Sequence, residues 1–547
     1  VQGTSFGERE EVESNSFSPA GTPTSRQTEF YQQQLGELLV TGAGNWTPTA
    51  RDTLNLNFRV MPRLYTNNAA ADVRLANGTP FAAIAFDYEE KDVWHLDLGG
   101  DWEHRFSPQN AVKLTALFRM INWKPRQVLT QVPLLPPIPQ VGSERHDDSD
   151  NQAGEPIVRG VWTLKPNAEH TIEFGLEGAY NYREVERVSE IGFIGGPFSP
   201  LAVPVASTKV EEERVEASIT DVWRMNPQLT LETGFNYEAS TISQTISQPA
   251  SPDIERDFTY PKPRAVLTWV PNKTDQWRFS VVRDVSQLDF GDFATGLDSI
   301  SAEANVGNPN LEPEQTWKLN AQWKRPIGQR GSISLTGFYD DIEDTQDFIP
   351  VVVPCPTVAA PTATCIRTAV GNVGDGERWG GRIETTLQLD GIGVKNGLLK
   401  LNVGAQESKV IDPVTGVERE ISSEAEYDWS VDFRQDIPSW KVAWGGNYSS
   451  IGPNPFYRMD RVEIVDPEEG DLDLFVETTR FLGGALVRLT AANLFDPDRS
   501  VDRQKFATTE LTPATLPNIS PRSTFTGTEL RDSTFGRTVQ LTIAGAF

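Results

Sequence analysis

The chain ends in the stretch Arg537-Thr538-Val539-Gln540-Leu541-Thr542-Ile543-Ala544-Gly545-Ala546-Phe547. Side chains of an extended chain point alternately to two faces, so apolar residues at every second position predict a strand with one apolar face. Here the apolar face carries Val539, Leu541, Ile543 and Phe547. Ending on such a strand suits a barrel whose last strand closes against its first. A soluble β-sandwich can also end this way, so the rest of the chain decides.

The same alternation recurs along the whole chain. Clear examples begin at Leu54, Trp94, Ile172, Leu229 and Leu399. Several of these patterns run past ten residues, the length that a tilted strand needs to cross a bilayer. The strands of a soluble sandwich would be shorter, with the apolar face turned to a core. The pattern therefore favours strands that cross a membrane.

The connectors between these segments fall into two classes that alternate along the sequence. Short connectors rich in Pro, Asn and Gly predict tight turns, and they lie near 107–110, 165–167, 225–227, 271–273 and 437–439. Long, irregular connectors cover roughly 124–155, 190–208, 285–310, 346–375, 452–470 and 500–535. A sandwich has no physical reason to sort its connectors by side, whereas an outer-membrane barrel has short periplasmic turns and long extracellular loops. We predict an all-β protein, a large antiparallel transmembrane β-barrel of about 22 strands.

The composition excludes a helical membrane protein. Hydrophobic residues make up 38% of the 547 residues, and the mean hydropathy is −0.40. No run approaches the roughly 18–20 apolar residues that a membrane-spanning helix needs. A barrel remains compatible with this polar average, because its lumen is polar and its lipid-facing band is only ~25 Å tall.

Charge and motifs also argue against an enzyme or a nucleic-acid-binding protein. The net charge of −27 repels nucleic acid, and no basic stripe offsets it. Gly3-Thr4-Ser5-Phe6-Gly7 matches the G-x-S-x-G pattern but lacks the strand–turn–helix context of a nucleophile elbow. The four histidines show no metal-ligand spacing. We therefore expect no catalytic residue, no metal site and no cofactor.

The two cysteines, Cys355 and Cys365, lie close together in a stretch rich in Pro, Thr and Ala. Their spacing allows a disulfide that closes a small loop, and such a bond needs an oxidising compartment such as the periplasm or the cell surface. A two-cysteine metal site is disfavoured because no histidine or third cysteine is near. We predict a disulfide between Cys355 and Cys365.

Tryptophans near the predicted strand ends are candidates for the aromatic girdles that mark the two membrane interfaces of a barrel. The candidates are Trp94, Trp102, Trp123, Trp162, Trp223, Trp269 and Trp444.

Three stretches of the sequence carry a family resemblance. The segment Val306-Gly307-Asn308-Pro309-Asn310-Leu311-Glu312-Pro313-Glu314-Gln315-Thr316-Trp317 resembles the GNPNLKPE signature of TonB-dependent outer-membrane receptors. The matching residues are Asn308, Pro309, Asn310, Leu311, Pro313 and Glu314. Asn493, Leu494, Phe495 and Asp496 resemble the NLFD motif of the family's penultimate strand. The terminal segment, with Val539, Leu541, Ile543 and Phe547, is similar to the family's last strand, which the barrel-assembly machinery reads.

The residue types in these motifs suit a structural role rather than contact with a ligand. Pro309 and Pro313 stiffen the edge of a loop and remove backbone donors from a ladder. Asn493 and Asp496 suit a strand end, where their side chains can hold the local backbone. We interpret both motifs as structural.

The resemblance implies an uptake receptor in the bacterial outer membrane. Its barrel would translocate a scarce nutrient such as a ferric siderophore, with oligosaccharide or cobalamin as alternatives, when the TonB complex pulls on a plug domain inside the lumen. The implied partners are outer-membrane lipid, the plug domain, the TonB energy-transducing complex, the barrel-assembly machinery and a small-molecule or oligosaccharide substrate.

The sequence departs from the family at its N-terminal end. Nothing in residues 1–50 resembles the plug or the short box that binds TonB. We expect residues 1–547 to form the barrel alone, with 1–25 as a first strand or a flexible lead-in. The plug would then have been removed, or it would be supplied by another segment. Because Val1 opens the chain without a signal peptide, we expect an upstream segment to have directed export.

Two other classes of protein remain as alternatives. One is a plugless diffusion channel or structural barrel of the outer membrane, which predicts no upstream plug. The other is a soluble secreted β-sandwich or propeller that binds carbohydrate, which predicts solubility without detergent.

Overall fold

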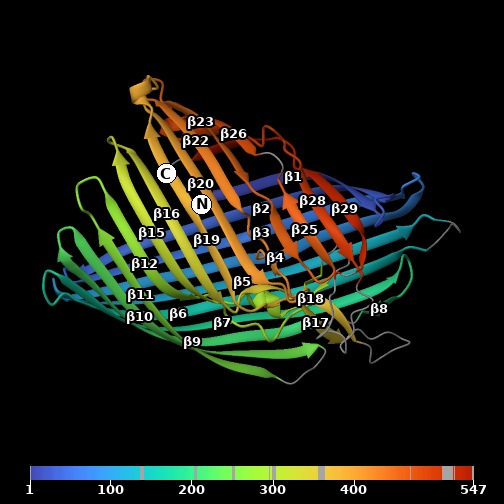
Figure 1. Ribbon diagram of the computed structural model, residues 1–547, viewed down its shortest axis with the longest axis horizontal. Helices are drawn as coiled ribbons and strands as arrows, with labels where there is room; N and C mark the ends of the chain where they lie inside the picture. Colours follow the sequence, from blue (N-terminus) through green and yellow to red (C-terminus); the bar gives the residue numbers. More distant parts are fainter. Residues whose placement is uncertain are drawn as a thin grey trace.

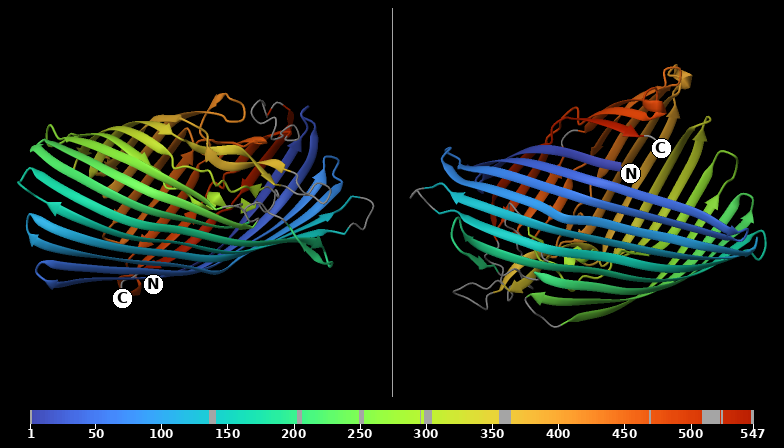
Figure 2. Two further views of the ribbon diagram at one scale, coloured as in Figure 1. Left: turned by 90° about the horizontal axis from the view of Figure 1, so that it is seen from below. Right: turned by 180° about the vertical axis from the view of Figure 1, so that it is seen from behind.

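The computed structural model of the chain describes residues 2–135, 141–201, 206–248, 253–294, 296–297, 304–354, 364–467, 470–507, 522 and 524–544. Nearly all of these residues lie in antiparallel strands, and one sheet contains 26 strand segments. Figures 1 and 2 show this sheet curling round as a wall of long, tilted strands. Among the described residues, no helix is long and apolar enough to cross a bilayer. The predicted fold class, a large antiparallel barrel, is confirmed.

The wall is built from long strands in the first half of the chain and from shorter or interrupted strands in the second half. The first half holds β1 (Gln2–Phe17), β2 (Pro23–Thr49), β3 (Asp52–Leu75), β4 (Pro80–Ser107), β5 (Asn110–Pro133), β6 (Ser143–Leu164), β7 (His170–Phe193), β9 (Ser207–Asn226), β10 (Leu229–Gln248), β11 (Ile254–Trp269) and β12 (Gln276–Val285). The second half holds β15 (Gln315–Ile327), β16 (Gly331–Glu343), β19 (Gly376–Gln388), β20 (Gly397–Ile411), β22 (Tyr427–Ile437), β23 (Val442–Ile451), β25 (Arg461–Asp466), β26 (Asp471–Thr478), β27 (Leu486–Ala492), β28 (Arg499–Phe506), β29 (Phe525–Thr534) and β30 (Thr538–Ala544).

Short elements lie within the connectors between these strands. They are β8 (Phe198–Pro200), η1 (Phe290–Phe293), β13 (Gly296–Leu297), β14 (Ala304–Asn305), β17 (Gln346–Pro354), β18 (Thr364–Asn372), η2 (Asp390–Ile392), β21 (Glu418–Arg419), β24 (Asn454–Tyr457) and η3 (Leu482–Gly484). The β17–β18 pair is a separate two-stranded sheet.

The C-terminal part of the sheet pairs with its first strand. In β29, Thr534 lies opposite Glu11 and Thr528 lies opposite Phe17 of β1. This ladder brings the two ends of the sheet together, as a barrel requires. The strand count of about 22 stays a prediction, because several strands of the second half are interrupted and are counted as separate segments.

Short and long connectors alternate in the later part of the chain, as the sequence predicts, whereas the first connectors, 18–22, 50–51, 76–79 and 108–109, are all short. Only residues 50–51 join β2 to β3 and only 227–228 join β9 to β10, whereas 286–314 join β12 to β15. The N- and C-terminal labels lie close together in both views of Figure 2. By the register of their strands, Gln2 and Ala544 both lie toward the end of the wall that carries the short turns.

The predicted bounds of several long loops are wrong. The range 124–155 is mostly strand, because β5 continues to Pro133 and β6 starts at Ser143. Much of this stretch, such as Glu144 to Gln152, is polar at consecutive positions. Strand segments beyond the lipid band meet water on their outer face and therefore carry no alternating pattern. Sequence patterning consequently detects only the membrane-spanning part of each strand.

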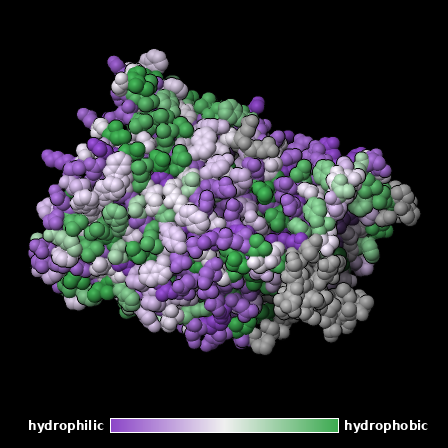
Figure 3. All heavy atoms as spheres, viewed as in Figure 1, coloured by the Kyte–Doolittle hydropathy of each residue, from purple (hydrophilic) through white to green (hydrophobic). Residues whose placement is uncertain are grey.

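Large apolar side chains are exposed on the outer face of the wall, near its short-turn end. Phe58 and Leu98 lie opposite each other on β3 and β4 and are 43% and 45% exposed. Phe174 and Ile219 form a similar pair on β7 and β9 and are 40% and 45% exposed. Leaving so many large apolar side chains in water would be unfavourable, because removing apolar surface from water contributes about 25 cal/mol of free energy per Å². The outer face therefore contacts lipid, and hydrophobic residues are gathered over the left and upper parts of Figure 3.

Tryptophans mark the boundary of this apolar belt. Trp102, Trp162, Trp223 and Trp444 are 37–44% exposed, and each lies a few residues from a short turn. An indole ring suits the interface between acyl chains and head groups, so these residues define the periplasmic girdle. The prediction for Trp123 is wrong, because its ring lies 5.2 Å from the guanidinium carbon of Arg183 on the lumen face.

Replacing Leu176 by Arg tests the lipid-facing assignment. Leu176 is 61% exposed and lies about midway along the belt on β7, so a charge there should lower the free energy of unfolding by about 2–4 kcal/mol. Folding into lipid vesicles, measured by denaturant titration, gives this value.

The matched control is Glu173→Arg, on the lumen face of the same strand, where the loss should stay below about 1 kcal/mol. Equal losses for the two variants would contradict the lipid-facing assignment.

Candidate functional site

Ion pairs cover the lumen face of the wall. On β11, Lys262 Nζ lies 2.7 Å from Glu238 Oε2 and also contacts Glu216. On β19, the Arg378 guanidinium lies 2.8 Å from Asp340 Oδ2 of β16. Paired charges on this face, opposite an apolar outer face, are the arrangement of a polar channel enclosed by a membrane barrel.

A further ion-pair network ties the last strands to the second strand. Arg503 contacts Glu463 at 2.6 Å and Glu529 at 2.9 Å. Arg531 Nη2 lies 3.2 Å from Glu29 Oε2, although the two residues are 502 positions apart. Glu29 is only 1% exposed, so breaking such a pair by removing one partner typically costs about 3–5 kcal/mol. This network supports the junction between the two ends of the sheet.

The connector between β12 and β15 folds back against the lumen wall and bounds a cavity of about 210 Å³. Its wall side is lined by residues of β5, β6, β7 and β9, among them Arg119, Arg183 and Glu212. Its loop side is lined by Gln287 to Phe290. Arg183 Nη1 lies 3.5 Å from Asp289 Oδ1 and bridges the two sides. The cavity is therefore a charged pocket inside the barrel.

A small buried core anchors this connector. Phe293, the last residue of η1, is 2% exposed and packs with Leu311, Val210 and Ile242. The Gln244 amide donates hydrogen bonds to the Phe293 carbonyl at 3.1 Å and to Thr208 Oγ1 at 3.0 Å. Apolar packing and a buried amide thus hold the loop to β9 and β10.

The nearby Asp292 has an altered acidity. Burial raises the pKa of its carboxyl to about 6, and the neighbouring Asp289 adds to this shift, while Arg183 opposes it. The loop therefore carries a carboxyl that changes its charge near neutral pH.

The GNPNLKPE-like segment lies in the same loop, where its side chains pack in the loop core and bind the backbone of neighbouring segments. Asn308 is 4% exposed, and its amide donates to the Val370 carbonyl at 2.9 Å. Leu311 is 1% exposed in the loop core. The Glu314 carboxylate accepts from the Gln346 backbone N–H at 3.1 Å. Pro309, Asn310 and Pro313 lie between these anchors, and Asn310 N–H donates to Asn308 Oδ1.

The NLFD-like segment lies at the break between β27 and β28. Asn493 and Asp496 have positive φ angles of 54° and 53°, which short polar side chains tolerate. Asn493 Nδ2 donates to the Gly536 carbonyl at 2.8 Å, and Asp496 Oδ1 accepts from the Gly536 N–H at 2.9 Å. Leu494 N–H bonds the Leu472 carbonyl, and the Phe495 ring packs edge-on against Tyr448. Gly536 lies in the break between β29 and β30. The motif therefore fixes the backbone at that break through Asn493 and Asp496.

The remaining predicted residues lie at the chain end and in the β17–β18 region. Val539, Leu541 and Ile543 are exposed on β30, which pairs with β27. Phe547 and Cys355 lie outside the described residues, and only the backbone of Cys365 is described, as part of β18. The disulfide and the assembly signal therefore stay predictions.

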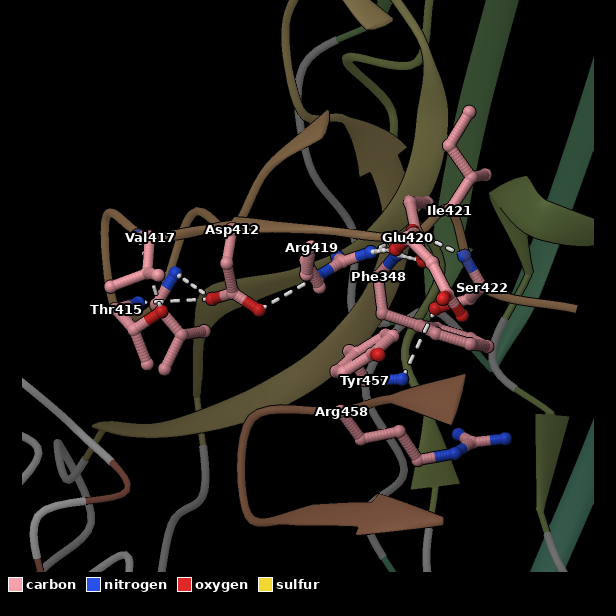
Figure 4. Close-up of polar contacts among 12 residues, drawn as sticks. Phe348, Asp412, Thr415, Val417, Arg419, Glu420, Ile421, Ser422, Tyr457 and Arg458 are labelled. Carbon is pink, nitrogen blue, oxygen red and sulfur yellow. Dashed lines mark hydrogen bonds and ion pairs between the residues drawn. The ribbon is translucent and has the colours of Figure 1, made fainter. Parts of the chain in front are cut away.

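Four connectors on the long-loop side meet in one buried ionic cluster, which we call the loop latch: Asp347, Asp412, Arg419, Tyr457 and Arg522. Figure 4 labels Asp412, Arg419 and Tyr457 of this cluster. Asp412 Oδ2 lies 2.8 Å from Arg419 Nε and 2.9 Å from Arg522 Nη1. Asp347 Oδ2 lies 2.6 Å from Arg419 Nη1. The Tyr457 ring lies under Arg419, 4.4 Å from the guanidinium carbon.

The loop latch is buried and charge-balanced. The side chains of Arg419 and Asp412 are 7% and 2% exposed. Burial by itself would raise the pKa of the Asp412 carboxyl, but Arg522, Arg419 and two backbone N–H donors lower it further than burial raises it. The net pKa is below the ordinary value, so the latch carboxylate is ionised.

The fold and the charged lumen together define an outer-membrane transport barrel. The family model described as TonB dependent receptor-like, beta-barrel matches residues 25–496. The chain therefore belongs to the TonB-dependent receptor family, whose members are transport receptors of the bacterial outer membrane and not enzymes. No curated protein sequence matches the chain.

Solved structures with the same fold are receptors and transporters. The ferripyoverdine receptor of the outer membrane of Pseudomonas aeruginosa, bound to ferripyoverdine, aligns over 99% of this chain and 72% of its own, with a TM-score of 0.59 and 12% identity. Copper transporter OprC aligns over 97% and 81%, with a TM-score of 0.57 and 12% identity. The unliganded ferric citrate transporter FecA aligns over 97% and 78%, with a TM-score of 0.52 and 8% identity. At these identities the likeness establishes the fold.

Sequence reasoning missed the loop latch and the lumen cavity. Arg419 and Asp347 are 72 positions apart, and Arg522 and Asp412 are 110 apart. None of these residues belongs to a motif whose spacing would link it to its partner. Only the folding of separate loops over one end of the barrel brings these side chains together.

Replacing Asp412 by Asn tests the loop latch. The change leaves Arg419 and Arg522 without their shared carboxylate, and such a loss costs about 3–5 kcal/mol in buried pairs. Hydrogen exchange should accelerate in residues 412–426 and 454–457, while the belt strands keep their protection. Glu418→Gln, an exposed change in the same loop, is the control.

The pH dependence of the wild-type latch follows from the lowered pKa of Asp412. A carboxyl with a lowered folded pKa stabilises the folded state above its unfolded pKa, and this stabilisation is lost as pH falls through the folded value. Protection of the latch should persist at pH 5 and disappear only below about pH 4. Loss of protection already at pH 6 would contradict this assignment.

Proposed function

We propose that this barrel takes up a ferric siderophore across the outer membrane. Membership of the TonB-dependent receptor family supports an energised uptake role. The observation that carries the siderophore proposal is the lumen cavity under the β12–β15 connector, which presents cationic and aromatic side chains together. Substrate would be captured at the long-loop end and pass this cavity on its way through the lumen.

The chemistry of the cavity suits an anionic iron chelate. Arg119 and Arg183 supply guanidinium groups, which bind carboxylate and other oxygen anions through paired donors. Phe290 supplies a ring at the same cavity, and ring faces pack against flat organic ligands. Two of the structural relatives bind or carry iron complexes, namely ferripyoverdine and ferric citrate.

Uptake of an oligosaccharide or of cobalamin is the alternative. Rings stacking on sugars would support it, and the carboxylates Glu155, Glu212 and Asp289 at the cavity suit hydroxyl groups as well as cations. A plugless diffusion channel is a further alternative, in which the same charged lumen would serve only as a pore.

The proposed mechanism needs partners that act on the barrel. The charged lumen wall is suited to a plug domain that closes the channel, and the TonB complex would pull on that plug to release substrate. The barrel-assembly machinery would insert the chain, reading the exposed apolar face of β30. The barrel itself would act as a rigid wall, with its loops as the selective element.

Equilibrium dialysis of the purified chain in detergent tests the substrate class. We expect iron-labelled ferric pyoverdine or ferric citrate to be retained, and cobalamin and maltohexaose not to compete. Arg183→Gln should weaken retention about tenfold, because a hydrogen bond to a charged group contributes on that order. The control is Lys113→Gln, a lumen cation paired with Asp101 away from the cavity. Retention of only the sugar or cobalamin would overturn the siderophore proposal.

Planar-bilayer recordings test whether the lumen of this chain is open. Lumen side chains such as Arg119 and Lys113 are 61% and 48% exposed, so water reaches the lumen wall. We expect a large, steady conductance from the folded chain and none from the heat-denatured chain. A folded, inserted chain without conductance would mean that the loops themselves close the channel.

A further inference from the structure

Three similar clusters lie on the outer face, each containing a tryptophan near a short turn. In the first, Asp52 Oδ1 accepts from the Trp102 indole N–H at 3.2 Å and lies 2.7 Å from His104 Nδ1. The His104 ring lies between two rings, with centroids 5.8 Å from Trp102 and 4.6 Å from Phe106. A carboxylate therefore holds both an imidazole and an indole at one point of the surface.

The second cluster repeats this chemistry on β7 and β9. Asp221 Oδ2 lies 2.8 Å from His170 Nδ1. The His170 ring stacks on Trp223, with a centroid distance of 5.5 Å and an interplanar angle of 13°. The other carboxylate oxygen of Asp221 has no hydrogen-bond partner among the described residues. That oxygen is itself buried, although the Asp221 side chain as a whole is 31% exposed.

The third cluster replaces imidazole by guanidinium. Asp275 Oδ1 accepts from the Trp323 indole N–H at 3.0 Å, and Arg325 Nη1 lies 3.7 Å from the same oxygen. We call the three clusters headgroup triads: Asp52, Trp102 and His104; Asp221, His170 and Trp223; Asp275, Trp323 and Arg325. Each combines a carboxylate, a nitrogen base and an indole.

The headgroup triads share one level of the barrel. Asp52 is the first residue of β3, His170 is the first residue of β7, and Asp275 immediately precedes β12. All three positions adjoin short turns, and the exposed apolar belt begins directly beyond them with Leu98, Ile219 and their neighbours. This level corresponds to the head groups of the periplasmic leaflet, where indole rings are favoured.

We propose that the headgroup triads bind phospholipids of the periplasmic leaflet whose head groups carry both a phosphate and an ammonium. The imidazole or guanidinium is the partner for the phosphate, and the carboxylate is the partner for the ammonium. The indole and the neighbouring apolar side chains pack against the glycerol and acyl parts. The Asp–His contact uses Nδ1 as the donor, which leaves Nε2 for the head group. The protonated imidazole donates from Nε2 to the phosphate, whereas the neutral imidazole accepts there from the ammonium.

Charge complementarity favours this lipid over a purely anionic one. In each triad a carboxylate stands beside the base, and the whole chain carries a net charge of −27. An anionic head group would meet repulsion from the carboxylate without an ammonium to offset it. A quaternary ammonium supplies charge but no N–H donor, so it would bind the carboxylate less well than a primary ammonium.

Native mass spectrometry of the purified 547-residue chain in detergent tests the proposal. Phosphatidylethanolamine, phosphatidylglycerol and phosphatidylcholine are added in turn, and the retained lipids are counted. We expect phosphatidylethanolamine to be retained most. The combined change His104→Gln, His170→Gln and Arg325→Gln should weaken its retention about tenfold, because hydrogen bonds to charged groups contribute on that order.

The matched control changes two histidines and one cation that lie away from the short-turn rim of the outer face: His95→Gln, His146→Gln and Lys324→Gln. His95 and Lys324 face the lumen, and His146 lies toward the long-loop end of β6. This variant should retain phosphatidylethanolamine like the wild type. Equal retention of all three lipids by the wild type, or equal losses in both variants, would overturn the proposal.

A variant with a single change tests the proposal even if the combined variant fails to fold. His170→Gln alone affects one triad and should lower the number of retained phosphatidylethanolamine molecules without abolishing retention. Heat-modifiable migration in gels checks that each variant remains a folded barrel. Unchanged retention in folded His170→Gln and in the folded combined variant would sink the proposal.

Discussion

Hydrogen bonding of the backbone within the sheet is the constraint on which the rest of this structure depends. Lipid offers no partner for an exposed N–H or carbonyl group, so a sheet that crosses a membrane must satisfy its own edges. The pairing of β29 with β1 brings the two ends of this sheet together, and the Arg531–Glu29 ion pair supports the same junction from inside. Once the wall curls in this way, its outer face must be apolar and its inner face is free to carry charge.

That division of faces explains where function can reside. The outer face supplies an apolar belt and a girdle of indoles, neither of which selects a substrate. The inner face supplies ion pairs and, under the β12–β15 connector, a cavity with two arginines and the ring of Phe290. At the long-loop end, the loop latch ties four connectors together, because the buried Asp412 binds both Arg419 and Arg522, and Arg419 also binds Asp347. The loops at this end are thus held by buried charge, on a wall held by backbone hydrogen bonds.

The sequence predicted part of this arrangement well. Alternating apolar residues indicated the strands, and the sorting of short and long connectors indicated which end carries the loops. The bounds of the loops were wrong where strands leave the membrane, as in 124–155, because both faces of those segments are polar. Trp123 was placed in the girdle, yet its ring packs on Arg183 inside the barrel, since proximity to a strand end does not reveal which face a residue occupies.

The sequence by itself determined the class of the fold, because period-two patterning is a local property that each strand carries in its own residues. It also indicated the family, through short motifs such as Asn308 to Glu314 and Asn493 to Asp496. Only the tertiary structure decided which distant side chains meet: Asp412 with Arg522, Arg183 with Asp289, and Asp52 with His104. These contacts arise from strand register and loop folding, which bring together residues whose separation in sequence leaves no periodic trace.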